Sequence, residues 1–249
     1  KDSPPFAWQG WREACEGRFD ATGLFEGFVR YETGTPRGSG IIWGDKSPTY
    51  IEHLPLLLAL YPQASIVHIV RDVRDQCVSL RKAFGKDLRR AAHRWNESVL
   101  AARRRAIRNR SRFHEVKYEE LLEQPEDQLR GICEFLRLEF SKDMLQLDRP
   151  VEPVGDGRAS AAILGGNHDK FAQRLTHAEI EAIESLAWEG MATFGYRPQV
   201  ARGPRQLANF ELTTLRLRDG ISLALNNAKR RGLSGAIRTL IGHQRVVRG

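Results

Sequence analysis

The sequence predicts an α/β fold in which a central parallel sheet is flanked by helices. Short apolar or β-branched runs at residues 41–46, 65–70 and 113–116 have the length of strands. Each run is followed by a segment with helical periodicity, and this alternation is typical of parallel sheets. The chain has 249 residues and 41% hydrophobic content, which suffices to bury one sizeable core.

The N-terminal elements are expected in the order helix, helix, strand, helix. Residues 1–33 carry aromatic side chains at loose helical spacing, and the Gly- and Pro-rich segment 34–40 ends that pattern. The first strand is predicted at 41–46. Pro48 then favours the start of a helix, which we expect over 50–61.

The next elements repeat the strand-then-helix order. The run 65–70 is continuous and β-branched, which is typical of a strand buried on both faces, and a helix is expected from Val73. A long polar helix is predicted at about 87–110. The third strand follows at 113–116, and another helix at 125–136.

The C-terminal part begins with a segment that lacks periodicity. Residues 148–175 are rich in Pro, Gly, Asp and Asn, so they predict a long loop, which in a compact domain is usually functional. Thr176 is expected to cap a helix that runs to about residue 194 and ends at Gly195. We therefore predict a domain over 1–204 and a basic helical extension over 205–249.

The composition limits the classes of partner and site. A formal charge of +8 suits an anionic partner, and a nucleotide, a sulfated glycan, an acidic protein, nucleic acid and a membrane surface all remain open. The cysteines form no CxxC pair and have no histidine at metal-ligand spacing, so no disulfide framework and no metal site is expected. The longest apolar stretch, 54–61, is far shorter than the ~20 residues of a spanning helix.

The strongest motif lies where the second predicted strand gives way to a helix. It contains Arg71, Asp72, Arg74 and Asp75, with Ser79 about two turns into the helix. Open α/β sheets bind ligands at the carboxyl ends of their strands, and a helix N-terminus with an arginine fork suits phosphate oxygens. Ion pairs between these arginines and aspartates on a solvated helix start are an equally good local interpretation.

This motif resembles the 3′-phosphate-binding motif of PAPS-dependent sulfotransferases, in which an arginine and a serine eight residues later hold the 3′-phosphate. The resemblance implies that role for Arg71 and Ser79. It also implies a three-layer P-loop-type fold with a central parallel sheet.

Other segments resemble segments of the same family and occur in the same order along the chain. Residues 43–50 are similar to its acid-Lys-Ser/Thr-Pro segment, which implies that Lys46 lies beside the transferring sulfuryl group. Residues 116–121 are similar to its Tyr-Glu-Asp-Leu segment, so Tyr118 would contact the nucleotide. Negative charge builds on the bridging oxygen of the leaving phosphate, and a fixed cation there stabilises the transition state.

The later chain resembles the carbohydrate and tyrosylprotein branch of the family. Residues 169–171 and the close at 194–196 are similar to the Lys-Trp segment and Gly-Tyr close of tyrosylprotein sulfotransferases. In those enzymes the loop lysine and an upstream serine bind the nucleotide. The resemblance implies these roles for Lys170 and Ser160.

The general base is less well defined. Cytosolic small-molecule sulfotransferases have Lys-Thr-His where this chain has Lys46, Ser47 and Pro48, so that histidine is absent. Asp45 is a weak candidate, because neighbours on a strand face opposite ways and Asp45 would then point away from the pocket of Lys46. His68, in the middle of a strand, is expected to be a core histidine.

The family also has a strand and a Pro-Lys/Arg-Ser-Gly-Thr phosphate loop near its start. Residues 36–40 have a similar composition but lack a strand before and a helix after them. We expect the loop and its strand to precede Lys1, so the fold would lack its first strand here.

Localisation is expected to be cytoplasmic for a bacterial protein, with the Golgi lumen also open.

The leading hypothesis is an enzyme that moves a sulfuryl group from PAPS to a hydroxyl or amine of a glycan, peptide or small molecule. It would release 3′,5′-ADP and need no metal. A non-catalytic nucleotide-binding module of the same family is one alternative, and a basic nucleic-acid or membrane-surface binder is another. No specific nucleic acid is expected for the enzyme, and homo-oligomerisation is left open.

Overall fold

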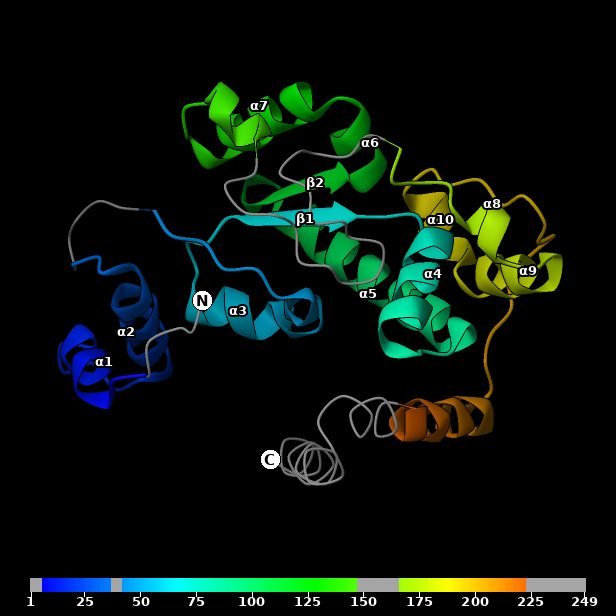
Figure 1. Cartoon of the computed structure of the whole chain (residues 1–249), viewed down its shortest axis with the longest axis horizontal. Helices are drawn as coiled ribbons and strands as arrows, with labels where there is room; N and C mark the ends of the chain where they lie inside the picture. The colour runs from blue at the N-terminus through cyan, green and yellow to red at the C-terminus, as the bar shows by residue number, and fades with distance from the viewer. Residues whose placement is uncertain (1–5, 37–41, 147–165, 223–249) are drawn as a thin grey trace. The chain divides into compact units, whose positions relative to one another are not determined.

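The structure, a computed structural model, describes residues 6–36, 42–146 and 166–222 (Figure 1). The chain divides into two compact units, Lys1–Ala64 and Ser65–Gly249. None of the helices in the described ranges is both long and apolar enough to cross a membrane.

The first unit is helical. Its elements are α1 (Trp8–Ala14), α2 (Ala21–Thr33), the 3₁₀ helix η1 (Pro48–His53) and α3 (Leu54–Leu60). Asp20 caps α2 by accepting a hydrogen bond from the N–H of Gly23, and Gly34 ends it in the left-handed conformation. The two short N-terminal helices predicted from the sequence are therefore confirmed.

The strand predicted at 41–46 is wrong over its described residues. Residues 42–46 have no strand pairing and are exposed. The run is apolar only at its start, and Trp43 packs instead against the rings of Phe25 and Tyr61, with centroids 5.6 Å and 5.9 Å away. These aromatic contacts cover only part of Trp43, which stays 39% exposed.

The second unit contains a small parallel sheet. Strands β1 (Ile66–Val70) and β2 (Phe113–Lys117) pair in register from Ile66 opposite Phe113 to Val70 opposite Lys117. Both strands were predicted, and the unit is mixed α/β, mostly helical. The expectation that β1 is buried on both faces is wrong at Ile69, which is 51% exposed, whereas Val70 is 2% exposed.

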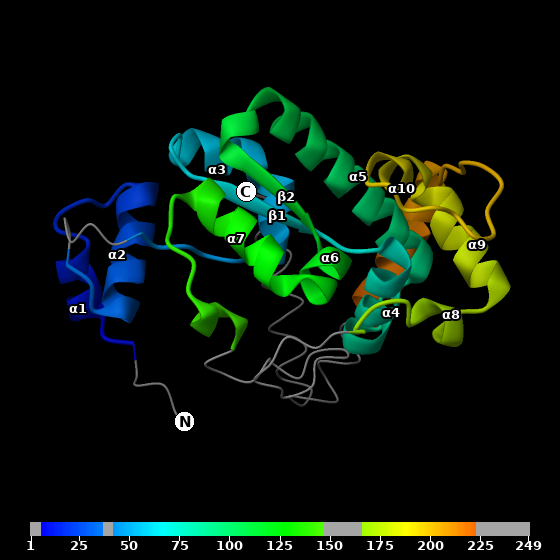
Figure 2. The same ribbon diagram turned by 90° about the horizontal axis from the view of Figure 1, so that it is seen from above.

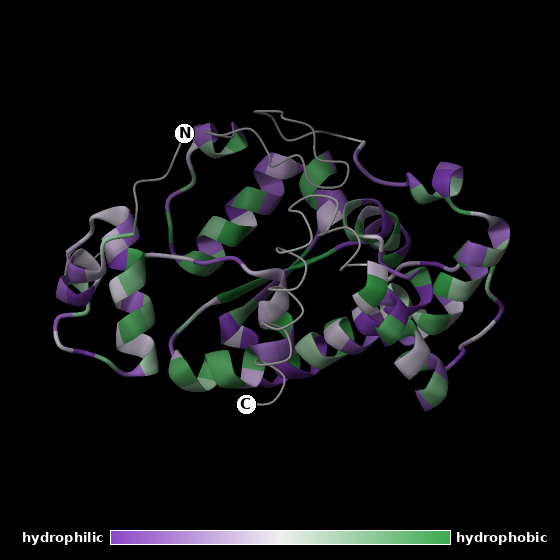
Figure 3. Cartoon of the chain, turned by 60° about the horizontal axis from the view of Figure 1, so that its bottom comes forward, coloured by the Kyte–Doolittle hydropathy of each residue, from purple (hydrophilic) through white to green (hydrophobic). Residues whose placement is uncertain are grey.

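Helices connect and surround the two strands. After β1 come α4 (Val73–Phe84) and α5 (Leu88–Arg108), and after β2 come α6 (Tyr118–Glu123) and α7 (Pro125–Leu136). Short 3₁₀ helices, η2 (Arg110–Arg112) and η3 (Lys142–Leu145), follow α5 and α7. The helices α4, α5 and α7 were predicted from the sequence, whereas α6 and the two 3₁₀ helices were not. Each of the longer ones carries both hydrophobic and hydrophilic residues along its length (Figure 3).

Three further helices of this unit follow the irregular segment 166–170. They are α8 (Phe171–Arg174), α9 (His177–Leu186) and α10 (Trp188–Thr193). Thr176 and Glu179 form the expected capping box. The single helix predicted to residue 194 is broken at Ala187. The break lets α10 bring Gly190 so close to Trp95 that an added Cβ would lie 2.7 Å from the ring.

The described start of the predicted extension packs into this unit. Residues 209–222 are helical, and Leu207 and Leu215 belong to the same buried cluster as Val73, Trp95 and Ile183. The carboxylate of Asp219 is buried and accepts a hydrogen bond of 2.9 Å from the N–H of Asp87. The boundary between 204 and 205 stays a prediction, and 205–222 contribute to the core.

Candidate functional site

The candidate site lies at the carboxyl ends of the two strands. Arg71 directly follows β1 and Tyr118 directly follows β2, and the last paired residues, Val70 and Lys117, hold these positions side by side. The guanidinium of Arg71 lies 4.6 Å from the centroid of the Tyr118 ring. The strands end toward α4, with α8 beyond it (Figures 1 and 2).

Asn167 connects three of the residues predicted to bind the nucleotide. Its backbone oxygen accepts a hydrogen bond of 2.9 Å from Nη2 of Arg71, and its Nδ2 donates one of 2.8 Å to the hydroxyl of Tyr118. Its Oδ1 accepts one of 2.5 Å from Nζ of Lys170. The structure thus brings Arg71, Tyr118 and Lys170 together. Sequence reasoning missed Asn167, for which the only signal was its place three residues before Lys170.

Arg71 retains hydrogen-bonding capacity at this site. Its Nε is buried and has no hydrogen-bond partner among the described residues. Oδ2 of the buried Asp75 likewise has none there, and lies 4.0 Å from Nη2 of Arg71. Burial raises the pKa of Asp75 above its ordinary value, although Arg71 opposes the shift. A guanidinium with a free buried donor is suited to a further oxyanion.

Arg74, the second arginine of the motif, has a different environment. It is 5% exposed and donates to both carboxylate oxygens of Asp72, at 3.0 Å from Nε and 2.6 Å from Nη2. Its Nη1 donates to the buried Glu184 at 2.8 Å, and its guanidinium lies 4.1 Å from the Phe171 ring centroid. Arg74 is therefore a structural residue. The ion pairs suggested by the sequence exist here in the core, not on a solvated helix start.

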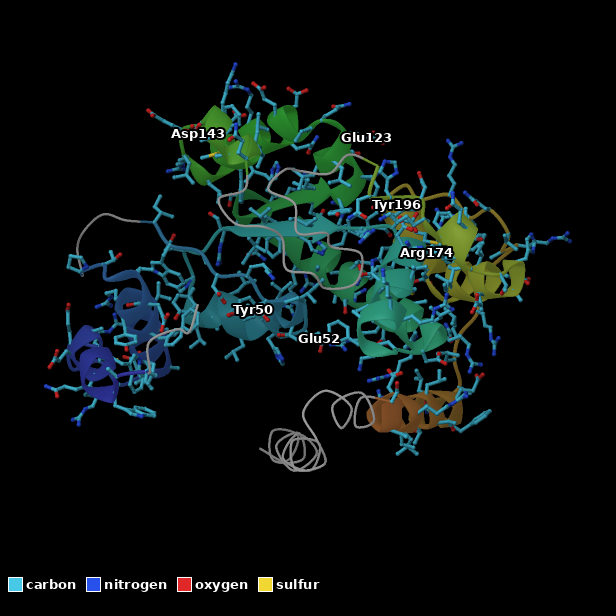
Figure 4. All side chains as sticks on the ribbon, in the orientation of Figure 1. Tyr50, Glu52, Glu123, Asp143, Arg174 and Tyr196 are labelled. Atoms are coloured by element: carbon cyan, nitrogen blue, oxygen red, sulfur yellow. The ribbon has the colours of Figure 1, made fainter. Side chains whose placement is uncertain are left out.

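Glu119 and Tyr196 fix the turn between β1 and α4. One carboxylate oxygen of Glu119 accepts from the N–H of Asp72 at 2.9 Å, and the other accepts from the hydroxyl of Tyr196 at 2.8 Å (Tyr196 is labelled in Figure 4). Burial and the charge of Glu119 raise the pKa of Tyr196. Glu119, just after β2, and Tyr196, just after α10, thus hold the backbone beside Arg71.

Of the two serines predicted to bind the nucleotide, the structure describes only Ser79. Ser79 is half-buried on α4, one helical turn beyond Asp75. Next to it in the chain, Val78 lines an open hollow of about 360 Å³ together with the cationic side chains of Arg81, Lys82 and Arg174. Ser160 lies outside the described residues.

Asp45 and Lys46 belong to the first unit, where both are exposed. The hydroxyl of Tyr50 donates a hydrogen bond to Oδ2 of Asp45, and this bond raises the pKa of Tyr50 to about 12 (Tyr50 is labelled in Figure 4). Since residues 42–46 are not a strand, the argument that Asp45 and Lys46 must face opposite ways no longer applies.

His68 is a core histidine, as expected. Its Nδ1 lies 3.1 Å from Oε1 of Glu115 on the neighbouring strand, and its ring packs edge-on against Phe194. Burial lowers its pKa to about 4. Within the described ranges, no group of three or more His, Cys, Asp or Glu side chains could hold a metal ion.

Comparison with known proteins adds a family to this geometry. The model of the sulfotransferase family matches residues 15–142, just over half of the chain. The solved sulfotransferase domain from the curacin biosynthetic pathway superposes with a TM-score of 0.53 and 17% identity, over 70% of this chain and 68% of that one. The two share a fold.

A relative is known from Aquifex aeolicus (strain VF5). It is an uncharacterized protein that is 27% identical over 120 residues, which is 44% of this chain. The chain spans only 16% of the length of that relative.

Proposed function

The chain belongs to the sulfotransferase family, and from this we propose that it transfers a sulfuryl group from PAPS to a hydroxyl or amine of an acceptor, releasing 3′,5′-ADP. One observation carries the proposal. Arg71, Tyr118 and Lys170, which come from separate parts of the sequence, converge on Asn167 at the carboxyl edge of the sheet.

The residues at this edge suit the 3′-phosphate end of the nucleotide. The buried Nε of Arg71 has no partner among residues 6–36, 42–146 and 166–222, and its guanidinium can offer a planar pair of donors to phosphate oxygens. The N-terminus of α4, a helix of twelve residues, adds the positive end of its dipole, and Asp72 caps it by accepting a hydrogen bond from the N–H of Arg74. We assign Ser79 to the same phosphate, and Tyr118 and Lys170 to the rest of the nucleotide. Ser160 is proposed as a further contact.

We assign the chemical step to Lys46 and Asp45. When the nucleotide is bound, Lys46 would stabilise the charge that builds on the leaving phosphate oxygen, and its exposed ammonium is available for this role. Asp45 is the proposed base, since its carboxylate is exposed and the hydrogen bond from the hydroxyl of Tyr50 engages only one of its two oxygens. A glycan or a tyrosyl peptide is the favoured acceptor, because residues 46–48 and the Lys170 loop resemble that branch of the family.

Replacing Lys46 tests the assignment. In the full-length gene product, assayed with labelled PAPS against sugars, peptides and small alcohols, Lys46→Ala should lower kcat by about 10²- to 10³-fold and change the KM for PAPS only slightly. The exposed Lys142 provides a control with the same change of charge. Equal losses in kcat and nucleotide affinity would contradict the role of Lys46. Nucleotide binding without transfer to any acceptor would favour the non-catalytic module.

A further inference from the structure

We infer that Asn167 is the positioning residue of the nucleotide site, and that its side chain and its backbone hold different parts of that site. The inference rests on the proposed function. It concerns a residue outside the motifs that indicated the family, and it predicts a separation between overall affinity and recognition of the 3′-phosphate.

The orientation of the amide follows from its partners. The ammonium of Lys170 can only donate, so the atom 2.5 Å from it is the carbonyl Oδ1 of Asn167. The amide Nδ2 then faces the hydroxyl of Tyr118, 2.8 Å away. The amide thus accepts from the lysine and donates to the tyrosine hydroxyl at once. A carboxylate could only accept, so the hydroxyl of Tyr118 would have to turn its proton toward it and would no longer be free to donate to a ligand.

The charge of the side chain matters as much as its geometry. Arg71 and Lys170 are both cations, and Asn167 gives each an acceptor without adding a negative charge. A carboxylate side chain at this position would bind Lys170 more strongly and would repel an incoming phosphate. The neutral Asn167 therefore holds Lys170 through its side chain and Arg71 through its backbone oxygen, while the charge of both cations stays available to the nucleotide.

The loop that carries Asn167 is fixed to α4. Oδ1 of the buried Asp75 accepts a hydrogen bond of 2.9 Å from the N–H of Phe171, at the start of α8. Gly166 and Asp169 adopt the left-handed conformation, with φ of 73° and 57°, and turn the chain on either side of Asn167. The lysine and tyrosine are thus ordered before a ligand arrives, which reduces the entropy lost on binding.

Backbone and side-chain contacts can be separated by mutation. Asn167→Ala removes the contacts to Tyr118 and Lys170 but leaves the backbone oxygen that accepts from Arg71. We expect the affinity for 3′,5′-ADP, measured by calorimetry, to fall about tenfold. The ratio of the affinities for 3′,5′-ADP and 5′-AMP should stay as in the wild type, because Arg71 is still held. A collapse of the loop would lower both the affinity and this ratio.

A double-mutant cycle tests whether Asn167 acts through Lys170. In a Lys170→Ala background, Asn167→Ala should lower the affinity for 3′,5′-ADP only about two- to threefold, since the contact between Asn167 and Lys170 is already lost. Asn167→Asp should weaken binding more than Asn167→Ala. Asn109→Ala is the matched control, because the side chain of Asn109 donates to the backbone oxygen of Arg105 at the end of α5.

The outcomes separate this inference from the proposed function. A wild-type chain that does not bind 3′,5′-ADP would refute the proposed nucleotide site itself. If the wild-type chain binds 3′,5′-ADP and the affinities of Asn167→Ala and Asn167→Asp lie within twofold of the wild type, only the role of Asn167 is refuted. If Asn167→Ala lowers the affinity for 3′,5′-ADP by the same factor in the wild type and in Lys170→Ala, Asn167 does not act through Lys170.

Discussion

Two arginines three residues apart in the same motif have different environments. Arg71 lies at the strand end with a buried Nε that has no partner in the described part of the chain, whereas Arg74 is enclosed by Asp72, Glu184 and Phe171. Breaking a buried ion pair by removing one partner leaves an uncompensated charge, which costs about 3–5 kcal/mol. Substitutions at Arg74 should therefore affect folding, and substitutions at Arg71 should affect binding.

Glu184 makes the stability of the protein sensitive to acid. Burial alone would raise its pKa, but the N–H groups of Ala201, Gln199 and Val200 and the guanidinium of Arg74 lower it below the ordinary value. The unfolded state therefore takes up a proton first as the pH falls. The stabilisation is fully present above about pH 4.5 and is lost as the pH falls through the folded-state pKa.

Glu184→Gln should remove this dependence. At pH 7 the free energy of unfolding in urea should fall by about 3–5 kcal/mol, and its further loss between pH 5 and pH 3 should be smaller than in the wild type. Glu181, exposed on the same helix α9, is the control, and its Gln variant should behave as the wild type. Identical acid profiles for the two variants would show that the buried pair does not carry the effect.

At the scale of the elements, the sequence predicted best where local and tertiary signals agree. The strands at 66–70 and 113–117 were predicted because each is a short apolar run followed by a helix, and the helix Pro125–Leu136 because a helical period begins at a boundary proline. The strand at 41–46 was wrong because an apolar run does not show what will cover it. The break at Ala187 depends on the contact of Gly190 with Trp95, which no local pattern records.

The candidate site was predictable only in part, for a related reason. Arg71, Tyr118 and Lys170 were predicted from motifs, and the structure brings them together. Asn167 was missed because a loop has no periodicity and its contacts with Tyr118 and Arg71 are made across 49 and 96 residues of sequence. Glu184 was missed because a glutamate on an amphipathic helix is usually exposed.

At the scale of the whole molecule, the basic C-terminal segment is partly core. Leu215 is 2% exposed and Leu217 is 65% exposed on the same helix, so the two residues form a matched pair. Leu215→Ala should lower the free energy of unfolding of the 249-residue chain by about 2–5 kcal/mol, and Leu217→Ala by less than about 0.5 kcal/mol. Denaturant melts would show this difference. Equal, small effects would mean that the segment after residue 204 is an independent extension.

The account as a whole depends on the 3′-phosphate being bound at Arg71. Calorimetric titration with 3′,5′-ADP and with 5′-AMP isolates that phosphate, because the two ligands differ in nothing else. The wild type should bind 3′,5′-ADP about 10- to 100-fold more tightly, and Arg71→Ala should reduce this preference nearly to unity. Arg104→Ala, which removes the same charge from an exposed position on α5, should keep it. Equal binding of the two nucleotides by the wild type, or an unchanged preference in Arg71→Ala, would contradict the assignment.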